Sequence, residues 1–343
     1  MAKPSKLKQL IQTVTKDVVR HPAELTRFYM DEYGISRVSA TKYILQLESE
    51  GWIARSGPKT RPIFSPGYKR RFSKLYKLAG LEEHVAWLED FKQYFNLTPN
   101  VQNIVSHGFT KMLNNAIDHS TGREVFVWAD QGETTFALKI SDDGVGIFKK
   151  IATALKLPDM RLALFELSKG KFTTDPSRHS GEGVFFTSRM FDAFEIVAND
   201  LKFNHDENFD DLLLEEKSDV GEDGTTVHMR IRLDSPRTAA DVYAQFTKAP
   251  EDFDFSKTVV PMRLAQYGEE QLVSRSQAKR VIARFDRFKL IILDFQGVQE
   301  VGQAFADEIF RVYALDHPNV ELVPKGMSMQ VEKMWLRAVA PRM

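Results

Sequence analysis

The feature that most constrains the fold is a strand-like run that ends in two acids and two glycines. Residues 135–140 read TFALKI, and residues 142–146 read DDGVG. Glycines allow positive φ and a close approach of the backbone. A carboxylate fixed at Asp142 could accept a hydrogen bond from an exocyclic amine such as that of adenine. An ordinary strand-ending turn is the alternative interpretation, because Asp-Gly pairs often mark one.

A helix is predicted shortly before this strand. Apolar residues recur at helical spacing from Phe109 to Ile117, and the same stretch carries Asn114, Asn115 and His119. The carbonyl oxygen of an Asn side chain is a hard ligand of the kind that Mg²⁺ accepts when phosphates and water fill its other positions. Asn side chains that merely face water are the alternative.

A third segment has the composition of an anion site. The polar, cationic residues 169–176 run into Ser180-Gly181-Glu182-Gly183, and an apolar run that predicts a helix follows. Backbone N–H groups at a helix N-terminus behind glycines bind anions, and nearby Lys or Thr groups add donors. A Gly-rich structural turn is again the alternative. Further on, Gly224-Thr225-Thr226 precedes a predicted strand over residues 227–231.

In order and spacing, these segments resemble the N, G1 and G2 boxes and the Gly-Thr element of the GHKL ATP-binding domain. That domain is shared by histidine kinases, gyrase, the ninety-kilodalton heat-shock chaperones and mismatch-repair ATPases. The resemblance covers residues 99–235 and implies an α/β sandwich that binds ATP with Mg²⁺, with Asn115 as the metal ligand. The residues expected to bind the nucleotide are Asn114, Asn115, His119, Asp142, Gly144, Gly146, Lys171, Thr173, Gly181, Gly183 and Thr226.

Two departures from the GHKL pattern bear on activity. Lys111 stands where hydrolysing members carry the Glu that acts as general base, and a protonated lysine cannot take a proton at neutral pH. Phe185 stands where many relatives carry a further glycine. No substitute base is evident, so the catalytic residue is unknown and hydrolysis is in doubt. An ATP-responsive DNA-binding regulator is therefore favoured over the alternative, an ATPase or a Ser/Thr protein kinase of the anti-sigma type.

Composition sets further bounds on the chain. It has 343 residues and no cysteine, so disulfides and thiolate metal sites are excluded. No run approaches the ~18 consecutive apolar residues of a membrane span, and a cytoplasmic protein is expected. Lys and Arg balance Asp and Glu at 47 each, yet residues 1–75 carry 15 of the basic and 6 of the acidic residues. A basic end of this kind suggests nucleic acid or an acidic partner, although a solvated face is the commoner cause.

The basic end has the pattern of a helix-turn-helix followed by a wing. Two amphipathic segments precede Ser36, which is expected to cap a helix that carries the apolar residues Val38 to Leu47. Residues 52–64 predict a cationic β-hairpin. Residues 1–68 resemble the winged-helix DNA-binding domain, which implies contacts to double-stranded DNA, although some winged helices bind only proteins. The expected DNA-binding residues are Arg37, Ser39, Thr41, Lys42, Arg55, Lys59 and Arg61.

A helical linker is expected over residues 69–98. Apolar residues between Phe72 and Phe91 recur near helical spacing. Such a stripe is usually core, but at a domain junction it could pair two protomers, and a homodimer is expected.

The C-terminal portion, residues 250–343, is predicted to form a small α/β domain. Residues 258–260 and 290–294 read as buried strands, and residues 269–288 and 304–314 as helices. Residues 293–310 resemble a STAS-like family, whose relatives are phosphorylated on a Ser or Thr after the strand. The corresponding turn, residues 299–303, has no hydroxyl, so this domain is expected to bind a partner protein or sense a signal.

Overall fold

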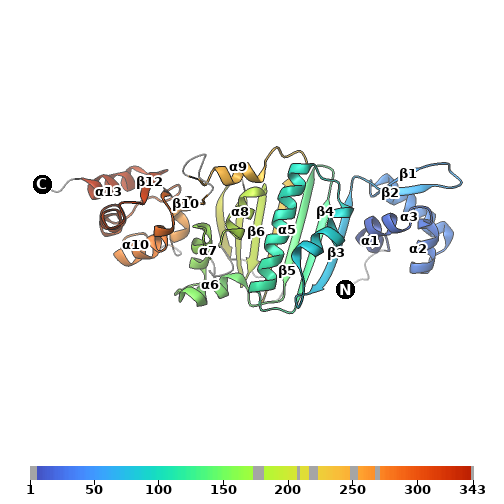
Figure 1. The fold of residues 1–343 in the computed structure, drawn as a ribbon, viewed down its shortest axis with the longest axis horizontal. Helices are drawn as coiled ribbons and strands as arrows, with labels where there is room; N and C mark the ends of the chain where they lie inside the picture. The colour runs from blue at the N-terminus through green and yellow to red at the C-terminus, as the bar shows by residue number, and fades with distance from the viewer. Residues whose placement is uncertain are drawn as a thin grey trace. The chain divides into compact units, whose positions relative to one another are not determined.

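The computed structural model describes residues 6–172, 181–206, 209–215, 223–247, 254–266 and 271–340 (Figure 1). Contacts divide the chain into two compact units. The first comprises Met1–Gly144, Phe191–Ile196 and Gly224–Pro236, and the second comprises Val145–Met190, Val197–Asp223 and Arg237–Met343. Helices and strands occur in both units, so the mixed α/β class and the multidomain organisation expected from the sequence are confirmed.

The first unit opens with a small module, residues 6–68, which we call the N-terminal module. Its elements are α1 (Lys6–Arg20), α2 (Leu25–Tyr33), α3 (Arg37–Ser49) and the antiparallel hairpin of β1 (Ile53–Ser56) and β2 (Ile63–Pro66). Apolar residues from all three helices and from both strands form its core. The Ser36 side chain caps α3 by accepting a hydrogen bond from the Ser39 amide at 3.2 Å, as predicted.

The rest of the first unit is a sheet with a long helix on one face. Its strands lie in the order β3 (Arg70–Lys77), β4 (Glu124–Gln131), β5 (Thr135–Asp142), β9 (Thr225–Arg232) and β6 (Ala193–Ala198). Buried and less buried residues alternate along β4 and β5, so each strand has one core face. Helix α5 (Pro99–His119) packs on β5 and β9 (Figure 1).

The helical linker predicted over residues 69–98 is divided in the structure into a strand and a helical segment. Residues 70–77 form β3, which pairs antiparallel with β4 and brings Phe72 opposite Ala129. Helical structure begins only at Glu83, in α4 (Glu83–Val85) and the two short helices Ala86–Phe91 and Lys92–Tyr94. Apolar spacing of three residues is compatible with a helix, but pairing with β4 decides the outcome here. Phe72 and Phe91 are buried within the chain, and their rings lie 4.9 Å apart.

Arg71 ties the N-terminal module to the sheet. Its backbone amide donates to Thr15 Oγ1 of α1 at 2.8 Å, and its Nε lies 2.6 Å from Asp130 Oδ1 on β4. The guanidinium also lies 5.3 Å from the ring centroid of Trp52 and 5.5 Å from that of Trp128. One side chain therefore combines an ion pair with two cation–π contacts, and it joins elements far apart in sequence.

In its described residues, the second unit begins with three helices and a hairpin. These are α6 (Ile147–Leu155), α7 (Arg161–Ser168), α8 (Gly183–Met190) and the antiparallel strands β7 (Leu201–Asp206) and β8 (Phe209–Glu215). Helix α9 (Ala239–Ala244) follows and packs against α8. Aromatic rings of Phe185, Phe186, Phe246 and Phe255 contact one another beside these helices.

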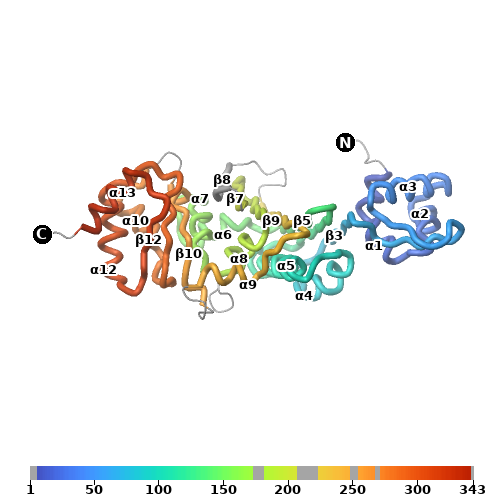
Figure 2. The backbone as a smooth tube through the Cα atoms, turned by 90° about the horizontal axis from the view of Figure 1, so that it is seen from above, coloured from blue at the N-terminus to red at the C-terminus, as the bar shows by residue number. Residues whose placement is uncertain are grey.

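Residues 257–340 form what we call the C-terminal module. Its three parallel strands lie in the order β10 (Lys257–Pro261), β11 (Leu290–Asp294) and β12 (Glu321–Lys325). The helical elements are a turn at Met262–Ala265, α10 (Arg275–Ile282), a turn at Phe285–Arg287, α11 (Gln303–Asp307), the π-helix Glu308–Tyr313, α12 (Ala314–Asp316) and α13 (Met329–Val339). Figure 2 follows the backbone through these elements.

The predicted small α/β domain is therefore present, with differences in its parts. The helix expected over 269–288 is shorter, since α10 begins after the cap at Ser274, and residues 267–270 lie outside the described chain. β12 and α13 were not predicted. β12 is short, contains Pro324 and has no fully buried residue, so it lacks the signal of a core strand. Within the described residues, no helix combines the length and the apolarity needed to cross a lipid bilayer.

Candidate functional site

The carboxylate of Asp142 is fixed at the end of β5 by two backbone amides. Its Oδ1 accepts hydrogen bonds from the amides of Gly144 at 2.9 Å and Thr225 at 3.2 Å. Among the described residues, Oδ2 has no hydrogen-bond partner. Burial raises the pKa of this carboxyl to about 6, although the two amides favour the charged form. The side chain is thus oriented by the backbone and keeps one oxygen able to accept from a ligand.

The turn that carries Asp142 fits tightly between α5 and β9. A Cβ on Gly144 would lie 2.1 Å from the carbonyl oxygen of Ser120, which follows α5, so only glycine fits there. Gly224, immediately before β9, has φ +103° and would place a Cβ 2.3 Å from the Asp142 carbonyl oxygen. These close approaches explain why glycines flank the acidic pair. They also bring the three predicted segments of the first unit together.

Asp143, the other acid of the turn, has a different role. Its Oδ1 accepts from the amides of Arg123 at 2.7 Å and Glu124 at 3.0 Å, which joins the turn to the start of β4. These backbone hydrogen bonds, above all that from Glu124, hold the pKa of Asp143 below its usual value. Asp143 is therefore a structural carboxylate and a natural control for Asp142.

The predicted polar residues of α5 lie near the C-terminal end of the helix. Asn114 and Asn115 are half-buried, and the Nδ2 atom of Asn115 lies 3.9 Å from Met112 Sδ. No other side-chain hydrogen bond of these two residues occurs within the described part of the chain. The carbonyl oxygen of Asn115 therefore meets the requirement for a metal ligand. His119 is the last residue of α5.

Lys111 lies on the exposed side of α5, one turn after His107. Burial, together with the charge of Lys111, lowers the pKa of His107 to about 4. His107 is consequently neutral at pH 7 and a weak base. His107 therefore does not have a pKa suited to a general base that activates water.

Thr226, a predicted nucleotide contact, is buried and its hydroxyl lies 2.6 Å from that of Ser141 on β5. This pair faces across adjacent strands, because Ser141 and Thr226 are in register. The hydroxyl of Thr226 thus already has one partner, and its neighbour Thr225 supplies the amide that holds Asp142.

In the second unit, an asparagine that was not predicted holds the glycine turn at Gly146. Asn199 Oδ1 accepts from the Lys149 amide at 3.1 Å, and its Nδ2 donates to the Val145 carbonyl at 3.1 Å. This clamp fixes the start of α6. Asn199 and Asp200 both have positive φ, so the Asn-Asp pair between β6 and β7 was the available sequence signal for a tight turn.

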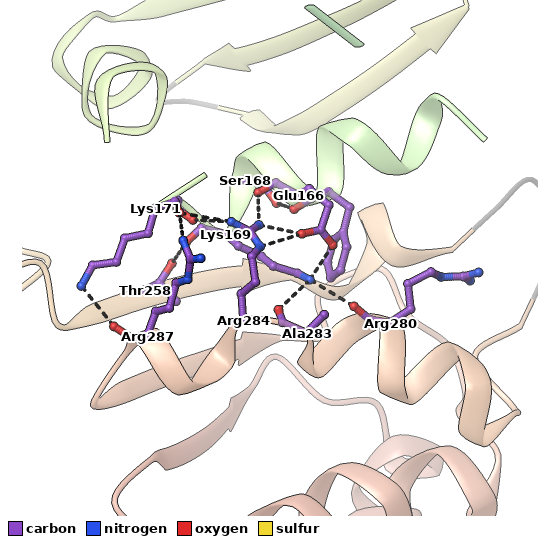
Figure 3. Close-up of polar contacts among 11 residues, drawn as sticks. Glu166, Ser168, Lys169, Lys171, Thr258, Arg280, Ala283, Arg284 and Arg287 are labelled. Atoms are coloured by element: carbon purple, nitrogen blue, oxygen red, sulfur yellow. Dashed lines mark hydrogen bonds and ion pairs between the residues drawn. The ribbon is translucent and has the colours of Figure 1, made fainter. Parts of the chain in front are cut away.

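The other residues predicted to bind phosphate lie in or next to residues 173–180. That segment, which contains Thr173, is outside the described chain. Phe172 and Gly181, on either side, are joined by a hydrogen bond from the Phe172 amide to the Gly181 carbonyl at 3.1 Å. Gly183 is the first residue of α8. Lys171 points to the C-terminal module, where its Nζ donates to the Arg287 carbonyl at 3.1 Å (Figure 3).

A buried ionic cluster lies next to these residues in the second unit (Figure 3). Glu166 of α7 accepts from Lys169 Nζ at 2.7 Å through Oε1 and from Arg284 Nη2 at 2.6 Å through Oε2. The side chains of Glu166 and Lys169 are almost completely buried. Burial lowers the pKa of Lys169 to about 8, against the opposing effect of Glu166. One carboxylate thus pairs with two cations, and the cluster keeps a net positive charge when all three groups are ionised.

The same cluster joins α7 to the C-terminal module. Lys169 Nζ also donates to the carbonyls of Arg280 and Ala283 at 3.1 and 3.3 Å, at the C-terminal end of α10. These carbonyls lack intrahelical partners, and a cation is favoured there. Thr258 Oγ1 of β10 donates to the Lys169 carbonyl at 2.8 Å. The segment before residue 173 is therefore anchored on two elements of the C-terminal module.

The predicted DNA-binding side chains lie on the outside of the N-terminal module. All are exposed except Ser39, whose hydroxyl lies 3.1 Å from that of Ser36. Arg55 pairs with Glu48 at 2.9 Å, and Thr41 Oγ1 donates to the Arg37 carbonyl. Arg37 and Lys42 lie on α3, and Lys59 and Arg61 lie in the loop of the hairpin. A helix face and a loop thus present cations to solvent.

Comparison with known proteins identifies one part of the chain. The model of a STAS-like domain of unknown function (DUF4325) matches residues 277–332, within the C-terminal module. The STAS-like character inferred from residues 293–310 is thereby confirmed. A search of curated proteins finds no match to the chain.

Removing the carboxylate of Glu166 from the ionic cluster should lower the stability of the protein strongly. Replacement of Glu166 by Gln leaves the buried charges of Lys169 and Arg284 without a counterion, so we expect the free energy of unfolding to fall by about 3 kcal/mol. Chemical denaturation measures the change. Glu300→Gln, which neutralises an exposed glutamate of the same unit, is the control and should change stability by less than ~0.5 kcal/mol. Equal stability of the two variants would contradict the assigned role of Glu166.

Proposed function

We propose that the protein binds Mg-ATP at the Asp142 turn and DNA through the N-terminal module, and that it acts as a nucleotide-responsive, DNA-binding regulator. The observation that supports this proposal most strongly is the environment of Asp142. Two backbone amides orient its carboxylate, and Oδ2 has no partner among the described residues. An acceptor held in a fixed orientation on a half-buried side chain suits a ligand amine.

Adenine has the matching chemistry. Its exocyclic amine would donate to Asp142 Oδ2, whereas guanine carries a carbonyl oxygen at the same ring position and would meet the carboxylate with a second acceptor. Binding should therefore favour ATP over GTP. GHKL-type ATP binding, which the order of the sequence motifs suggests, is the specific form of this proposal.

Mg²⁺ and phosphate would be bound beyond the adenine contact. Asn115 would supply one oxygen to Mg²⁺, with phosphates and water completing the coordination. Asn114 and His119 on the same helix are the other proposed contacts from α5. The backbone at Gly181 and Gly183, at the start of α8, offers amide donors for phosphate. Lys171 would have to leave its contact with Arg287 to take part.

Binding without rapid hydrolysis is the proposed outcome. Lys111 occupies the position of the general base, and His107 has a pKa of about 4, so activation of water by α5 is not supported. A bound nucleotide would then act as a signal that lasts until it dissociates. To regulate, it must bind one arrangement of the protein more tightly than another.

The N-terminal module is proposed to bind double-stranded DNA in the manner of a winged helix. Helix α3 would enter the major groove with Arg37 and Lys42, and the hairpin loop would contact the backbone through Lys59 and Arg61. Arg71 offers a path for coupling, because it contacts Trp52 of the module and Trp128 and Asp130 of the sheet. A conformational change in the sheet would thereby be transmitted to the conformation of the N-terminal module.

The nucleotide proposal predicts that Asp142→Asn weakens ATP binding at least tenfold, because the acceptor is exchanged for an amide that can present a donor. Calorimetry with Mg-ATP at pH 7.5 measures the change. Asp143→Asn is the matched control. It should bind ATP normally, because the Asn side-chain oxygen can still accept from the Arg123 and Glu124 amides. The Asp142 variant should remain folded, because it removes a charge that burial disfavours.

The pH dependence of ATP affinity provides a second test of the contact between adenine and Asp142. The amine binds the ionised carboxylate, so the affinity of the unaltered protein should fall as the pH drops through about 6, while the Asn variant should lack this dependence. Unchanged ATP affinity in Asp142→Asn would refute the assignment.

The DNA proposal predicts that Arg61→Ala weakens binding to any duplex and lowers the salt dependence, with the slope of log K against log salt reduced by about 1. Fluorescence anisotropy with a labelled random duplex at several salt concentrations measures both. Arg27→Ala is the control, because Arg27 is an exposed arginine of α2 that pairs with Asp31. If both variants bind like the unaltered protein, the hairpin is not the contact surface.

A further inference from the structure

The last helix of the C-terminal module has an exposed face with an unusual distribution of side chains. Helix α13 packs on α11 and on the π-helix through its buried residues Val331 and Ala338. On the opposite side, Met329 is 82% exposed and Leu336 is 52% exposed. A shallow hollow of about 500 Å³ follows this side and is lined by Met329, Glu332, Lys333, Leu336, Arg337 and Ala340.

These six residues form one stripe. They fall at positions i, i+3, i+4, i+7, i+8 and i+11, so they share a single helix face. The stripe has apolar residues at both ends and at Leu336, Glu332 beside Lys333 in its N-terminal half, and Arg337 in its C-terminal half. We call it the α13 stripe. Its order of charges is the property that identifies a partner.

We propose that the α13 stripe binds the same stripe of a second copy of this chain, with the two helices antiparallel about a two-fold axis near residues 334 and 335. In this arrangement Glu332 of each copy faces Arg337 of the partner subunit, and Met329 faces Ala340 of the partner subunit. Two equivalent ion pairs then flank a centre formed by Leu336 and Lys333 of each copy. A two-fold interface requires this kind of self-complementary patch.

The centre of the stripe fits the same geometry. Leu336 of one copy would face Lys333 of the partner subunit, whose aliphatic stem can cover the leucine while its ammonium stays in water. A parallel pair would instead place Glu332 beside its own equivalent and Arg337 beside its own equivalent. Like charges in register are unfavourable, so the charge pattern selects the antiparallel pair.

The interface is small, because α13 has 11 residues and spans roughly 16 Å. Contacts of this size give weak association, and we expect a dissociation constant on the order of 10–100 μM. The inference uses neither the nucleotide contact nor the DNA contact. Its failure would leave both of those proposals intact, and theirs would leave it intact.

The test uses two variants of the full chain that should each lose self-association. Glu332→Arg makes the charged positions of the stripe entirely cationic, and Arg337→Glu leaves acids at both ends of the proposed ion pairs. Each variant alone should be monomeric in sedimentation velocity at concentrations where the unaltered protein forms dimers. An equimolar mixture should dimerise, because the two faces then attract across both pairs.

The mixture also separates loss of the interface from loss of the fold. Each substitution opposes the helix dipole at one end of α13 at a cost of ~0.5 kcal/mol, but misfolded chains would not recover association on mixing. Leu315→Glu, at an exposed leucine of α12, is the control and should leave dimers unchanged.

Three results would overturn the proposal. The first is an unaltered protein that stays monomeric at several hundred micromolar, well above the expected dissociation constant. The second is dimerisation that neither charge variant weakens, which would assign it to another surface. The third is a mixture that fails to associate although the unaltered protein does.

Discussion

The candidate site depends on two backbone amides that hold one carboxylate. The Gly144 and Thr225 amides belong to segments about 80 residues apart in sequence, and both donate to Asp142 Oδ1. This geometry needs the close approach of Gly144 to Ser120 and of Gly224 to Asp142, which only glycine permits. The turn therefore positions the end of α5, the end of β5 and the start of β9 together. The proposed adenine contact is a consequence of that constraint.

A second constraint operates in the second unit, where burial raises the free energy of ionised side chains. Glu166 pairs with both Lys169 and Arg284, and Lys169 also binds the last carbonyls of α10. Breaking such a cluster costs more than forming it gains, because each remaining ion is left desolvated. The segment leading to residue 173 is thus held by the STAS-like module. If residues near Gly181 bind phosphate, this cluster is the physical link through which the nucleotide would affect that module.

The sequence predicted elements well where the signal was local. The cap at Ser36, the hairpin after it, α5 and the strands β5, β9 and β11 follow from periodicity and turn residues. β3 was expected to be helical, because its pairing with β4 is a tertiary contact that spacing does not reveal. The same reason explains why the sequence did not reveal Asn199, Glu166 and Arg284. The contact of Asn199 with Lys149 and that of Glu166 with Arg284 join residues far apart in the chain. ATP binding, DNA binding and self-association remain predictions.

The most direct test of the account is hydrogen–deuterium exchange of the unaltered protein with and without Mg-ATP. Peptides that cover residues 110–122, 140–147 and 224–228 contain Asn115, Asp142 and Thr225. The account predicts slower exchange in all three when nucleotide is added, and a smaller effect with GTP. Exchange that is unchanged in these peptides at saturating Mg-ATP would contradict the assignment of the Asp142 turn as a nucleotide site.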